Sequence, residues 1–277
     1  MTPITFTNVS FTYPTVDEPN APAPEPVFSG LELDLPGGCT FLVGPNGIGK
    51  TTLMLLAGAR LFPEIGTVTI GGRDTHEFEN AGFEPELELE RNELVSFVYQ
   101  NMEFETAEPL GEILPLVAEN GANSAAAATV YDELIDVTDL RNRLSVRMHE
   151  LSKGEMQRAI LAMSVLYQSP VIMMDEPVFA VEPARAERLF GWLAERAATE
   201  RIDIYASVHD VEMARTHATS VILMHADGTV QVGDPADLLS RESLETAFRA
   251  PFDTLYQRQN LYRDLLNKSL GDEAGRQ

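Results

Sequence analysis

The chain has 277 residues, of which 44% are hydrophobic and 23% are charged, and its formal net charge is −23. This length allows one large domain or two modest ones, with a sizeable buried core. Because so negative a surface repels phosphate backbones and anionic lipid head groups, we expect no nucleic acid partner. A surface rich in acids, in a chain with only three lysines, suits either a salty habitat or colloidal solubility.

The sequence also predicts a cytoplasmic location. No apolar run is long enough to span a bilayer, and the first residues lack the basic and apolar regions of a secretion signal. The single cysteine, Cys39, excludes an intramolecular disulfide and fits a reducing compartment.

The first half of the chain begins with the alternating hydrophobicity of antiparallel strands, interrupted by a proline-rich loop. An apolar strand and a helix follow, and then a strongly acidic stretch. The elements predicted here are strands at 4–11 and 27–35 with the loop at 14–26 between them, a strand at 39–43, a helix at 52–58, a strand at 67–70, an acidic surface loop at 77–93 and a buried strand at 94–99.

The second half is dominated by helices, and from residue 151 onward they alternate with short strands. Such alternation is typical of a mostly parallel sheet covered by helices. Helical segments are predicted within 101–150, most clearly at 124–135, and the tail from 251 is also predicted to be helical. The predicted strands lie at 171–174, 202–208 and 219–224. No internal repeat is visible, so we expect one copy of the core unit.

The most specific motif lies at residues 44–52, which read Gly-Pro-Asn-Gly-Ile-Gly-Lys-Thr-Thr. This is the G-x-x-x-x-G-K-[ST] spacing of a phosphate-binding P-loop, and it lies between a predicted strand and a predicted helix. Lys50 is expected to reach the β- and γ-phosphates, and the Thr51 hydroxyl is expected to contact Mg²⁺. The alternative is a glycine-rich turn that binds nothing, which the strand–loop–helix context disfavours. The predicted phosphate-binding residues are Gly44, Pro45, Asn46, Gly47, Ile48, Gly49, Lys50, Thr51 and Thr52.

Two carboxylates end the apolar strand at 171–174. In P-loop enzymes such a strand delivers an aspartate to Mg²⁺, which predicts that Asp175 is a metal ligand. Glu176, one residue later, is placed to polarise an attacking water. A strand that ends in acids is common, so this interpretation depends on the P-loop upstream.

Residues 151–158 read Leu-Ser-Lys-Gly-Glu-Met-Gln-Arg and reveal a family. Together with the P-loop and the strand ending at Asp175 and Glu176, this segment resembles the signature motif of ABC ATPases, which is typically L-S-G-G-Q. The resemblance covers about residues 3–235, and its ordered set of motifs is highly specific.

The resemblance implies roles for further residues. Gln100 is similar to the Q-loop glutamine, a ligand of the metal with Thr51 and Asp175, and His209 to the switch histidine that contacts the γ-phosphate. Tyr13 is similar to the aromatic residue that stacks on adenine. Catalysis is assigned to Lys50, Glu176 and His209, and the signature residues Ser152, Lys153, Gly154 and Glu155 are assigned to nucleotide binding.

The signature segment departs from the family pattern at two positions. Lys153 and Glu155 stand where a glycine and a glutamine are usual. Ser152 and Glu155 also have the spacing of a capping box at a helix start, and this structural interpretation is compatible with phosphate binding. Because a cation near a helix N-terminus opposes the helix dipole, we hypothesise that Lys153 neutralises the γ-phosphate of a nucleotide bound by a partner subunit.

A second departure lies in residues 177–183, which resemble the D-loop. Phe179 replaces a small polar residue there and Glu182 replaces an aspartate. The change predicts either altered communication with the second site or a conservative substitution with local repacking.

The family implies an α/β fold: a P-loop NTPase core with a mostly parallel sheet, an N-terminal antiparallel β subdomain and an inserted α-helical subdomain. Residues 1–245 are predicted to form the ATPase domain, with the helical subdomain at about 101–168 and a short helical tail at 246–277. Function is implied as an ATP-hydrolysing subunit that powers a membrane transporter. It would work as a head-to-tail dimer with two ATPs and Mg²⁺, docked on transmembrane permease subunits through the helical region.

The sequence disfavours two alternatives to transport. A soluble ABC ATPase of the DNA-repair or translation type usually has long coiled-coil insertions or tandem ATPase units, which this chain lacks. A P-loop kinase has no use for the signature segment. Short segments around Phe11 and Gln100 look like energy-coupling-factor importers, but the match does not continue beyond Asn101.

Overall fold

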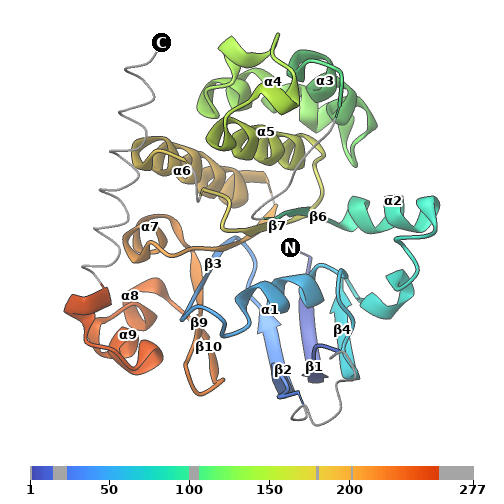
Figure 1. Cartoon of the computed structure of the whole chain (residues 1–277). Helices are drawn as coiled ribbons and strands as arrows, with labels where there is room; N and C mark the ends of the chain where they lie inside the picture. The colour runs from blue at the N-terminus through green and yellow to red at the C-terminus, as the bar shows by residue number, and fades with distance from the viewer. Residues whose placement is uncertain (1, 15–23, 100–105, 179–180, 201, 256–277) are drawn as a thin grey trace.

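The computed structural model describes residues 2–14, 24–99, 106–178, 181–200 and 202–255. Two sheets and a set of helices make up this part of the chain (Figure 1). The N-terminal sheet is antiparallel with strand order β2-β1-β4-β5, and the larger sheet has the order β10-β9-β3-β8-β7-β6. In the larger sheet, all neighbouring strands pair in parallel except β10, which is antiparallel to β9. The predicted α/β fold class is confirmed.

The described elements occur in the following order. They are β1 (Ile4–Phe11), β2 (Phe28–Leu35), β3 (Cys39–Val43), α1 (Lys50–Ala57), β4 (Ile65–Ile70), β5 (Arg73–Asp74), the 3₁₀ turn η1 (Thr75–Phe78), α2 (Pro85–Leu94), β6 (Val95–Val98), α3 (Leu110–Asn120), α4 (Ser124–Val137), η2 (Arg141–Arg143), η3 (Met148–Glu150), α5 (Lys153–Leu166), β7 (Val171–Asp175), α6 (Pro183–Glu200), β8 (Asp203–Ser207), α7 (Val211–His217), β9 (Ser220–Met224), β10 (Val230–Gly233), α8 (Pro235–Leu238) and α9 (Arg241–Phe248).

The larger sheet is buried on both faces, which explains why its central strands read as unbroken apolar runs. All five residues of β3 are buried. Because side chains alternate between the two faces of a strand, Phe41 packs into the core beneath α3–α6, whereas Leu42 packs into the core shared with α1 and the antiparallel sheet. The β7 strand divides its side chains in the same way, with Met174 in the first core and Met173 in the second.

Helices α3, α4 and α5 pack on one another at one end of the molecule (Figure 1). Their inward residues, among them Leu114, Leu134 and Leu161, are fully buried in one continuous core with the sheet. Among the described residues, none of the helices combines the length and the hydrophobicity that crossing a membrane requires.

One predicted element is wrong. The acidic stretch at 77–93 was expected to be a surface loop, but α2 begins at Pro85 and η1 covers its first residues. Proline at the first helical position and acids in the first turn both favour a helix start. Glu88 then bonds Arg91 and Asn92, three and four residues later on the same helix face. The high charge of this segment indicated a loop, but side-chain pairs along the helix stabilise it.

Other expectations differ at their edges or fall outside the description. The P-loop helix starts at Lys50, two residues earlier than predicted, and α4 runs two residues longer. The helix α9 spans residue 246, where the tail was predicted to begin. Most of the proline-rich loop and the tail from 256 lie outside the described residues.

Asp203 links the start of the chain to the larger sheet. Its side chain is buried, and its two carboxylate oxygens accept hydrogen bonds from the backbone N–H groups of Thr2 and Gly38, both at 2.8 Å. A buried carboxylate that accepts two backbone hydrogen bonds contributes substantially to stability, because its removal leaves two donors unpaired.

We predict that Asp203→Ala lowers the free energy of unfolding by about 2–3 kcal/mol, measured by urea titration. The matched control is Asp227→Ala, since the exposed Asp227 carboxylate also accepts a backbone hydrogen bond, from Thr229 at 2.9 Å. Water can replace that bond, so a much smaller change is expected. Equal losses in the two variants would contradict the role given to burial at Asp203.

Candidate nucleotide-binding site

The P-loop connects the end of β3 to the start of α1 in a conformation that needs glycine. Gly47 and Gly49 have φ angles of +77° and +104°, in the region that residues with side chains avoid. At Gly44 a Cβ atom would lie 2.6 Å from the carbonyl oxygen of Met224. Gly49 is also the N-cap of α1 and offers no side-chain acceptor to the first amides of that helix. These amides are therefore available to a bound anion.

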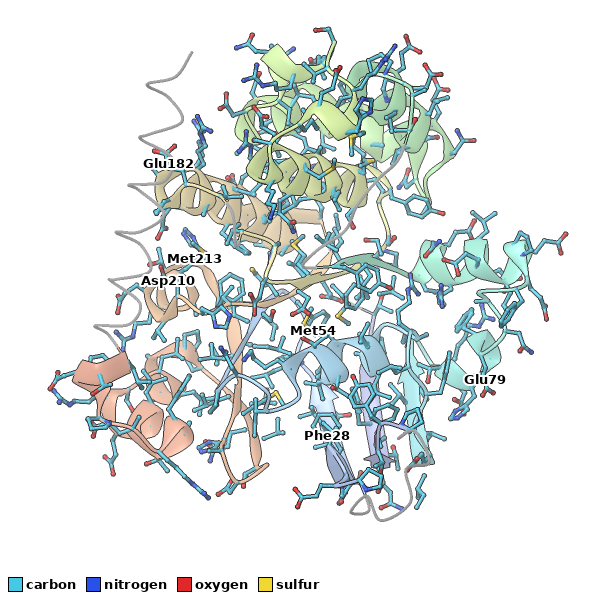
Figure 2. The ribbon with its side chains drawn as sticks, viewed as in Figure 1. Phe28, Met54, Glu79, Glu182, Asp210 and Met213 are labelled. Carbon is cyan, nitrogen blue, oxygen red and sulfur yellow. The ribbon has the colours of Figure 1, made fainter. Side chains whose placement is uncertain are left out.

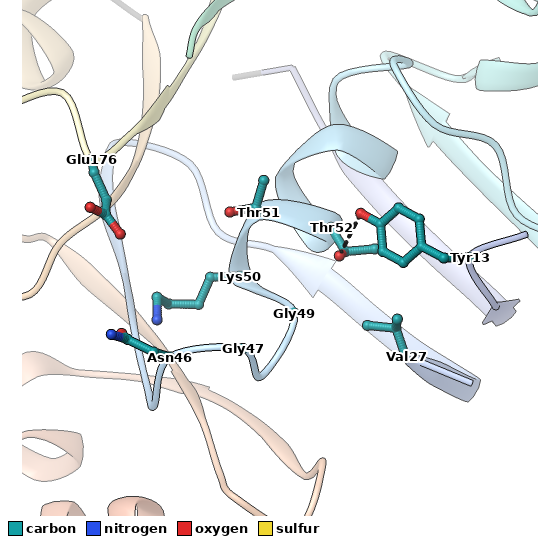
Figure 3. A pocket seen from close by; sticks show the side chains of 9 residues that line it. All are labelled: Tyr13, Val27, Asn46, Gly47, Gly49, Lys50, Thr51, Thr52 and Glu176. Carbon is teal, nitrogen blue, oxygen red and sulfur yellow. Dashed lines mark hydrogen bonds between the residues drawn. The ribbon is translucent and has the colours of Figure 1, made fainter. Parts of the chain in front are cut away.

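Lys50 lies at the centre of a pocket of about 380 Å³ (Figure 3). Its side chain is 7% exposed, and its ammonium group donates to the carbonyl oxygens of Gly44 at 2.8 Å and Pro45 at 3.0 Å. Burial lowers the pKa of Lys50, and the nearby carboxylates of Glu176 and Asp175 oppose that shift only in part. A desolvated cation in an otherwise acidic protein is a strong local attractor for phosphate.

Thr51 and Asp175 come together beside this cation. The Thr51 hydroxyl donates to Asp175 Oδ2 at 2.7 Å, and Asp175 ends β7 with its side chain buried. A hydroxyl and a carboxylate are hard oxygen donors of the kind that Mg²⁺ binds in nucleotide sites. The two residues therefore fit the predicted metal, and they lie at the pocket's sheet edge because parallel strands present their carboxyl ends on one side.

Glu176 and His209 face each other across the same edge. His209 Nε2 lies 2.6 Å from Glu176 Oε1, and Glu176 lines the pocket opposite Tyr13 (Figure 3). Glu176 has a φ angle of +49°, which is uncommon for a residue with a side chain and is typical of functional turns. The residue after His209, Asp210, caps α7 by accepting from the amides of Glu212 and Met213; the side chains of Asp210 and Met213 are labelled in Figure 2.

Tyr13 forms the far wall of the pocket. Its hydroxyl lies 3.1 Å from the Thr52 hydroxyl, and its ring packs edge-on against Phe11 with the centroids 5.0 Å apart. Tyr13 is 44% exposed, so it offers an aromatic surface to a planar group. This placement brings a predicted adenine-stacking residue next to a predicted phosphate loop.

The signature residues 152–155 do not line this pocket. They form the start of α5, where the predicted capping box is confirmed: the Ser152 hydroxyl accepts from the Glu155 amide, and Glu155 Oε2 accepts from the Ser152 amide at 2.9 Å. Lys153 is exposed. Gln100 and Phe179 lie outside the described residues, so the structure does not place the Q-loop glutamine or the altered D-loop residue. Glu182 pairs with Arg185 at 3.4 Å.

Sequence reasoning missed two residues that contact the predicted site residues. Arg143 donates to Glu155 Oε1 at 2.5 Å, and Ser207 donates to Asp175 Oδ1 at 2.6 Å. Arg143 precedes the signature by nine residues and gives no local signal. Ser207 could have been found, because it ends the strand next to β7 and parallel strand ends meet at one edge.

Cys39 takes no part in this chemistry. It is fully buried in the hydrophobic core. Burial raises the pKa of Cys39 to about 12, so the thiol stays protonated and unreactive at neutral pH.

Comparison with known proteins decides the family. The family model for ABC transporter matches residues 28–179, more than half of the chain. The chain belongs to the ABC transporter family. It is 33% identical over 233 residues to the hemin import ATP-binding protein HmuV of Rhizobium meliloti, covering 80% of this chain and 85% of that protein. It is 29% identical over 214 residues to the lipoprotein-releasing system ATP-binding protein LolD 1 of Rhodopirellula baltica, covering 76% of this chain and 89% of that protein.

Solved structures agree on the fold. A dimeric bacterial ABC transporter cassette superposes with a TM-score of 0.69 at 22% identity and covers 84% of this chain and 98% of its own. The ABC transporter protein described here is an ATP-binding, ATP-hydrolysing subunit that powers membrane transport, as the sequence motifs predicted.

The Glu155–Arg143 contact makes the signature turn sensitive to pH. Partial burial raises the pKa of Glu155, but hydrogen bonds from Arg143 and Ser152 outweigh it, so the net pKa lies below its ordinary value. The ionised carboxylate therefore stabilises the folded state above the ordinary pKa of 4.5, and this contribution is lost as the pH falls through the lower, folded-state pKa.

We predict that Glu155→Gln reduces the free energy of unfolding by about 0.5 kcal/mol near pH 7. The difference from wild type should shrink to nothing as the pH falls below 4.5, because a protonated Glu155 and a glutamine are both neutral. Urea titrations of both proteins between pH 3.5 and 7 (roughly the window in which a carboxyl titrates) measure this difference. A constant difference across that range would contradict the ion pair.

Proposed function

We propose that this subunit binds Mg·ATP in the pocket around Lys50 and hydrolyses it in a two-fold, head-to-tail dimer. The observation that carries the proposal is the separation of two sets of residues. Lys50, Thr51, Asp175, Glu176 and His209 gather at one sheet edge, while the signature residues begin a helix that does not line their pocket. A signature segment outside its own chain's site is free to close over the ATP of a second copy or a sister subunit.

Within one pocket, the phosphates meet Lys50 and the backbone N–H groups of residues 44–52 other than Pro45, and adenine stacks on Tyr13. Their charge and geometry support this: the Lys50 ammonium is desolvated, and the Tyr13 ring is partly exposed. Because phosphoryl transfer depends mainly on positioning and charge neutralisation, these contacts supply most of what the reaction needs from the protein.

The proposed metal is Mg²⁺, held by Thr51, Asp175 and Gln100. When bound, it neutralises charge on the β- and γ-phosphates. The oxygen donors of Thr51 and Asp175 are already paired at 2.7 Å, which orients both for a common ligand.

Glu176 is the proposed base that orients and deprotonates the attacking water, and His209 holds the γ-phosphate. Their contact at 2.6 Å supports a shared task, since the imidazole then lies where it can both orient the carboxylate and reach the phosphate. The positive φ of Glu176 directs its side chain into the pocket rather than along the strand.

We propose that ATP hydrolysis drives transport through permease subunits at the inner face of the membrane. The chain docks on them through residues 101–150 and the segment after Gln100. The two relatives above are named for hemin import and for lipoprotein release, so relatives of this chain are named for different cargoes. Because the general surface is acidic, nucleic acid is not proposed as a partner.

We expect Glu176→Gln to bind ATP, to accumulate as an ATP-bound dimer and to lose hydrolysis by at least about a hundredfold. The amide keeps the shape of the side chain but cannot accept a proton. Light scattering after gel filtration with and without Mg·ATP measures the dimer, and phosphate release measures turnover. The control is Glu195→Gln on the exposed face of α6, which should behave as wild type. Turnover at the wild-type rate in the Glu176 variant would refute the base.

Lys153 offers a second test that is specific to this chain. If its charge meets the γ-phosphate of the opposite site, then Lys153→Gln should weaken ATP-induced dimerisation about tenfold, and Lys153→Arg should retain most of it. Lys153→Gly restores the residue usual in the family and should also lose the charge contribution. The dimer is measured in the Glu176→Gln background, where hydrolysis does not deplete ATP. Hydrolysis is measured in the wild-type background. If all three variants dimerise as Glu176→Gln does and hydrolyse ATP as wild type does, the role of Lys153 is excluded.

A further inference from the structure

Ser207 is the last residue of β8, and its hydroxyl lies between the two carboxylate residues of the site. The residue is fully buried. Its Oγ donates to Asp175 Oδ1 at 2.6 Å and accepts from the backbone N–H of Glu176 at 2.9 Å. A serine hydroxyl has one proton to donate, and here that proton is committed to Asp175 while a lone pair receives Glu176.

This arrangement fixes Asp175 from two sides. Thr51 donates to Oδ2 at 2.7 Å and Ser207 donates to Oδ1 at 2.6 Å, so each carboxylate oxygen has its own hydroxyl donor. Short hydrogen bonds to an ionised carboxylate are directional and strong. Rotation of the carboxylate would break one or both of them.

The same hydroxyl holds the backbone where it turns into the site. Glu176 adopts a left-handed conformation at φ +49°, and such conformations persist only where the surroundings over-determine them. The amide of Glu176 bonds to Ser207 rather than continuing the ladder of β7, which ends at Asp175 in register with Ser207. Without this acceptor, the partly buried N–H of Glu176 would lose this hydrogen bond at the turn after β7.

We infer that Ser207 is a positioning residue that couples the two carboxylates through one hydroxyl. It orients the Asp175 carboxylate for the proposed metal, and it holds the backbone of Glu176 so that this side chain can reach the attacking water. The inference rests on the roles proposed above for Asp175 and Glu176. Ser207 itself touches neither nucleotide nor water in this role.

Ser169 is the matched control. It is equally buried, and its hydroxyl also donates a hydrogen bond of 2.6 Å, to the backbone carbonyl of Asn92. It lies just before β7, whereas Asp175 lies at the other end of that strand. Ser207→Ala and Ser169→Ala therefore each remove one buried hydroxyl from the same region of the sheet, at opposite ends.

The experiment compares both variants in urea titration, ATP hydrolysis and Mg²⁺-dependent binding of a fluorescent ATP analogue. We expect Ser207→Ala to lose more stability than Ser169→Ala, because it removes a bond to a carboxylate and a bond from a backbone N–H, whereas Ser169→Ala removes one neutral bond. Only Ser207→Ala should lower kcat, by roughly ten- to a hundredfold, with KM for ATP nearly unchanged, because the lost contacts orient groups rather than bind nucleotide. In a Glu176→Gln background, only Ser207→Ala should raise the Mg²⁺ concentration at half-maximal analogue binding, by several-fold.

Ser207→Cys keeps the size of the side chain with a weaker donor and should fall between wild type and Ser207→Ala. This variant also serves if the alanine form folds poorly. The inference is overturned if Ser207→Ala matches Ser169→Ala in both kcat and Mg²⁺ dependence. Glu176→Gln, measured in parallel, separates the two levels: its continued turnover would sink the proposed base, whereas an inactive Glu176 variant beside a fully active Ser207→Ala would sink only the present inference.

Discussion

The parallel pairing of β3, β8 and β7 is the constraint from which the site follows. Each strand ends at the same edge of the sheet, and each delivers one part of the chemistry there: the P-loop after β3, Ser207 and His209 at the end of β8, and Asp175 with Glu176 at the end of β7. A buried parallel sheet tolerates little slippage, because a shift of one residue would exchange the side chains of its two faces. The register that places Asp175 opposite Ser207 is therefore held by the packing of both cores, far from any nucleotide.

The signature segment shows how an unusual sequence can satisfy an ordinary structural requirement. A glutamate at residue 155 brings a negative charge to a helix start that is proposed to meet phosphate. Neighbouring groups compensate that charge: Arg143 pairs with Glu155, and the carboxylate also accepts a hydrogen bond from the Ser152 amide. The exposed Lys153 then adds a cation on the same turn. The carboxylate at residue 155 is thus paired with Arg143, while Lys153 lies exposed on the same turn.

The positive charge in the pocket contrasts with the acidic surface of the chain. In a chain with a net charge of −23, the Lys50 ammonium is a buried positive charge that donates to the backbone carbonyl oxygens of Gly44 and Pro45. Many arginines are engaged in surface ion pairs with neighbouring acids, such as Arg73 with Glu77 and Arg141 with Asp136. Such pairs contribute little to stability individually, but they limit self-repulsion on a surface of one dominant sign.

Much of the fold and of the site could be predicted from the sequence, since hydrophobic periodicity and motif spacing depend on residues close together in the chain. Alternating and continuous apolar runs indicated the antiparallel and parallel strands, and the P-loop spacing indicated a phosphate loop on a helix N-terminus. The α2 helix was missed because its periodicity is weak and its stability comes from side-chain pairs such as Glu88 with Arg91. Hydrophobic patterning does not report such pairs.

By itself, the sequence determined most of the strands, though not β5 and β10, together with the P-loop and the capping box at Ser152 and Glu155, because each depends on residues close together in the chain. Only the tertiary structure decided which distant residues make contact. Thr51 bonds Asp175, Ser207 bonds both Asp175 and Glu176, and Arg143 pairs with Glu155. Arg143 and Glu155 are 12 positions apart in the sequence, and Ser207 lies 31 and 32 positions from Glu176 and Asp175. Thr51 and Asp175 are 124 positions apart. The order of strands and their register create such contacts, and no local pattern encodes them.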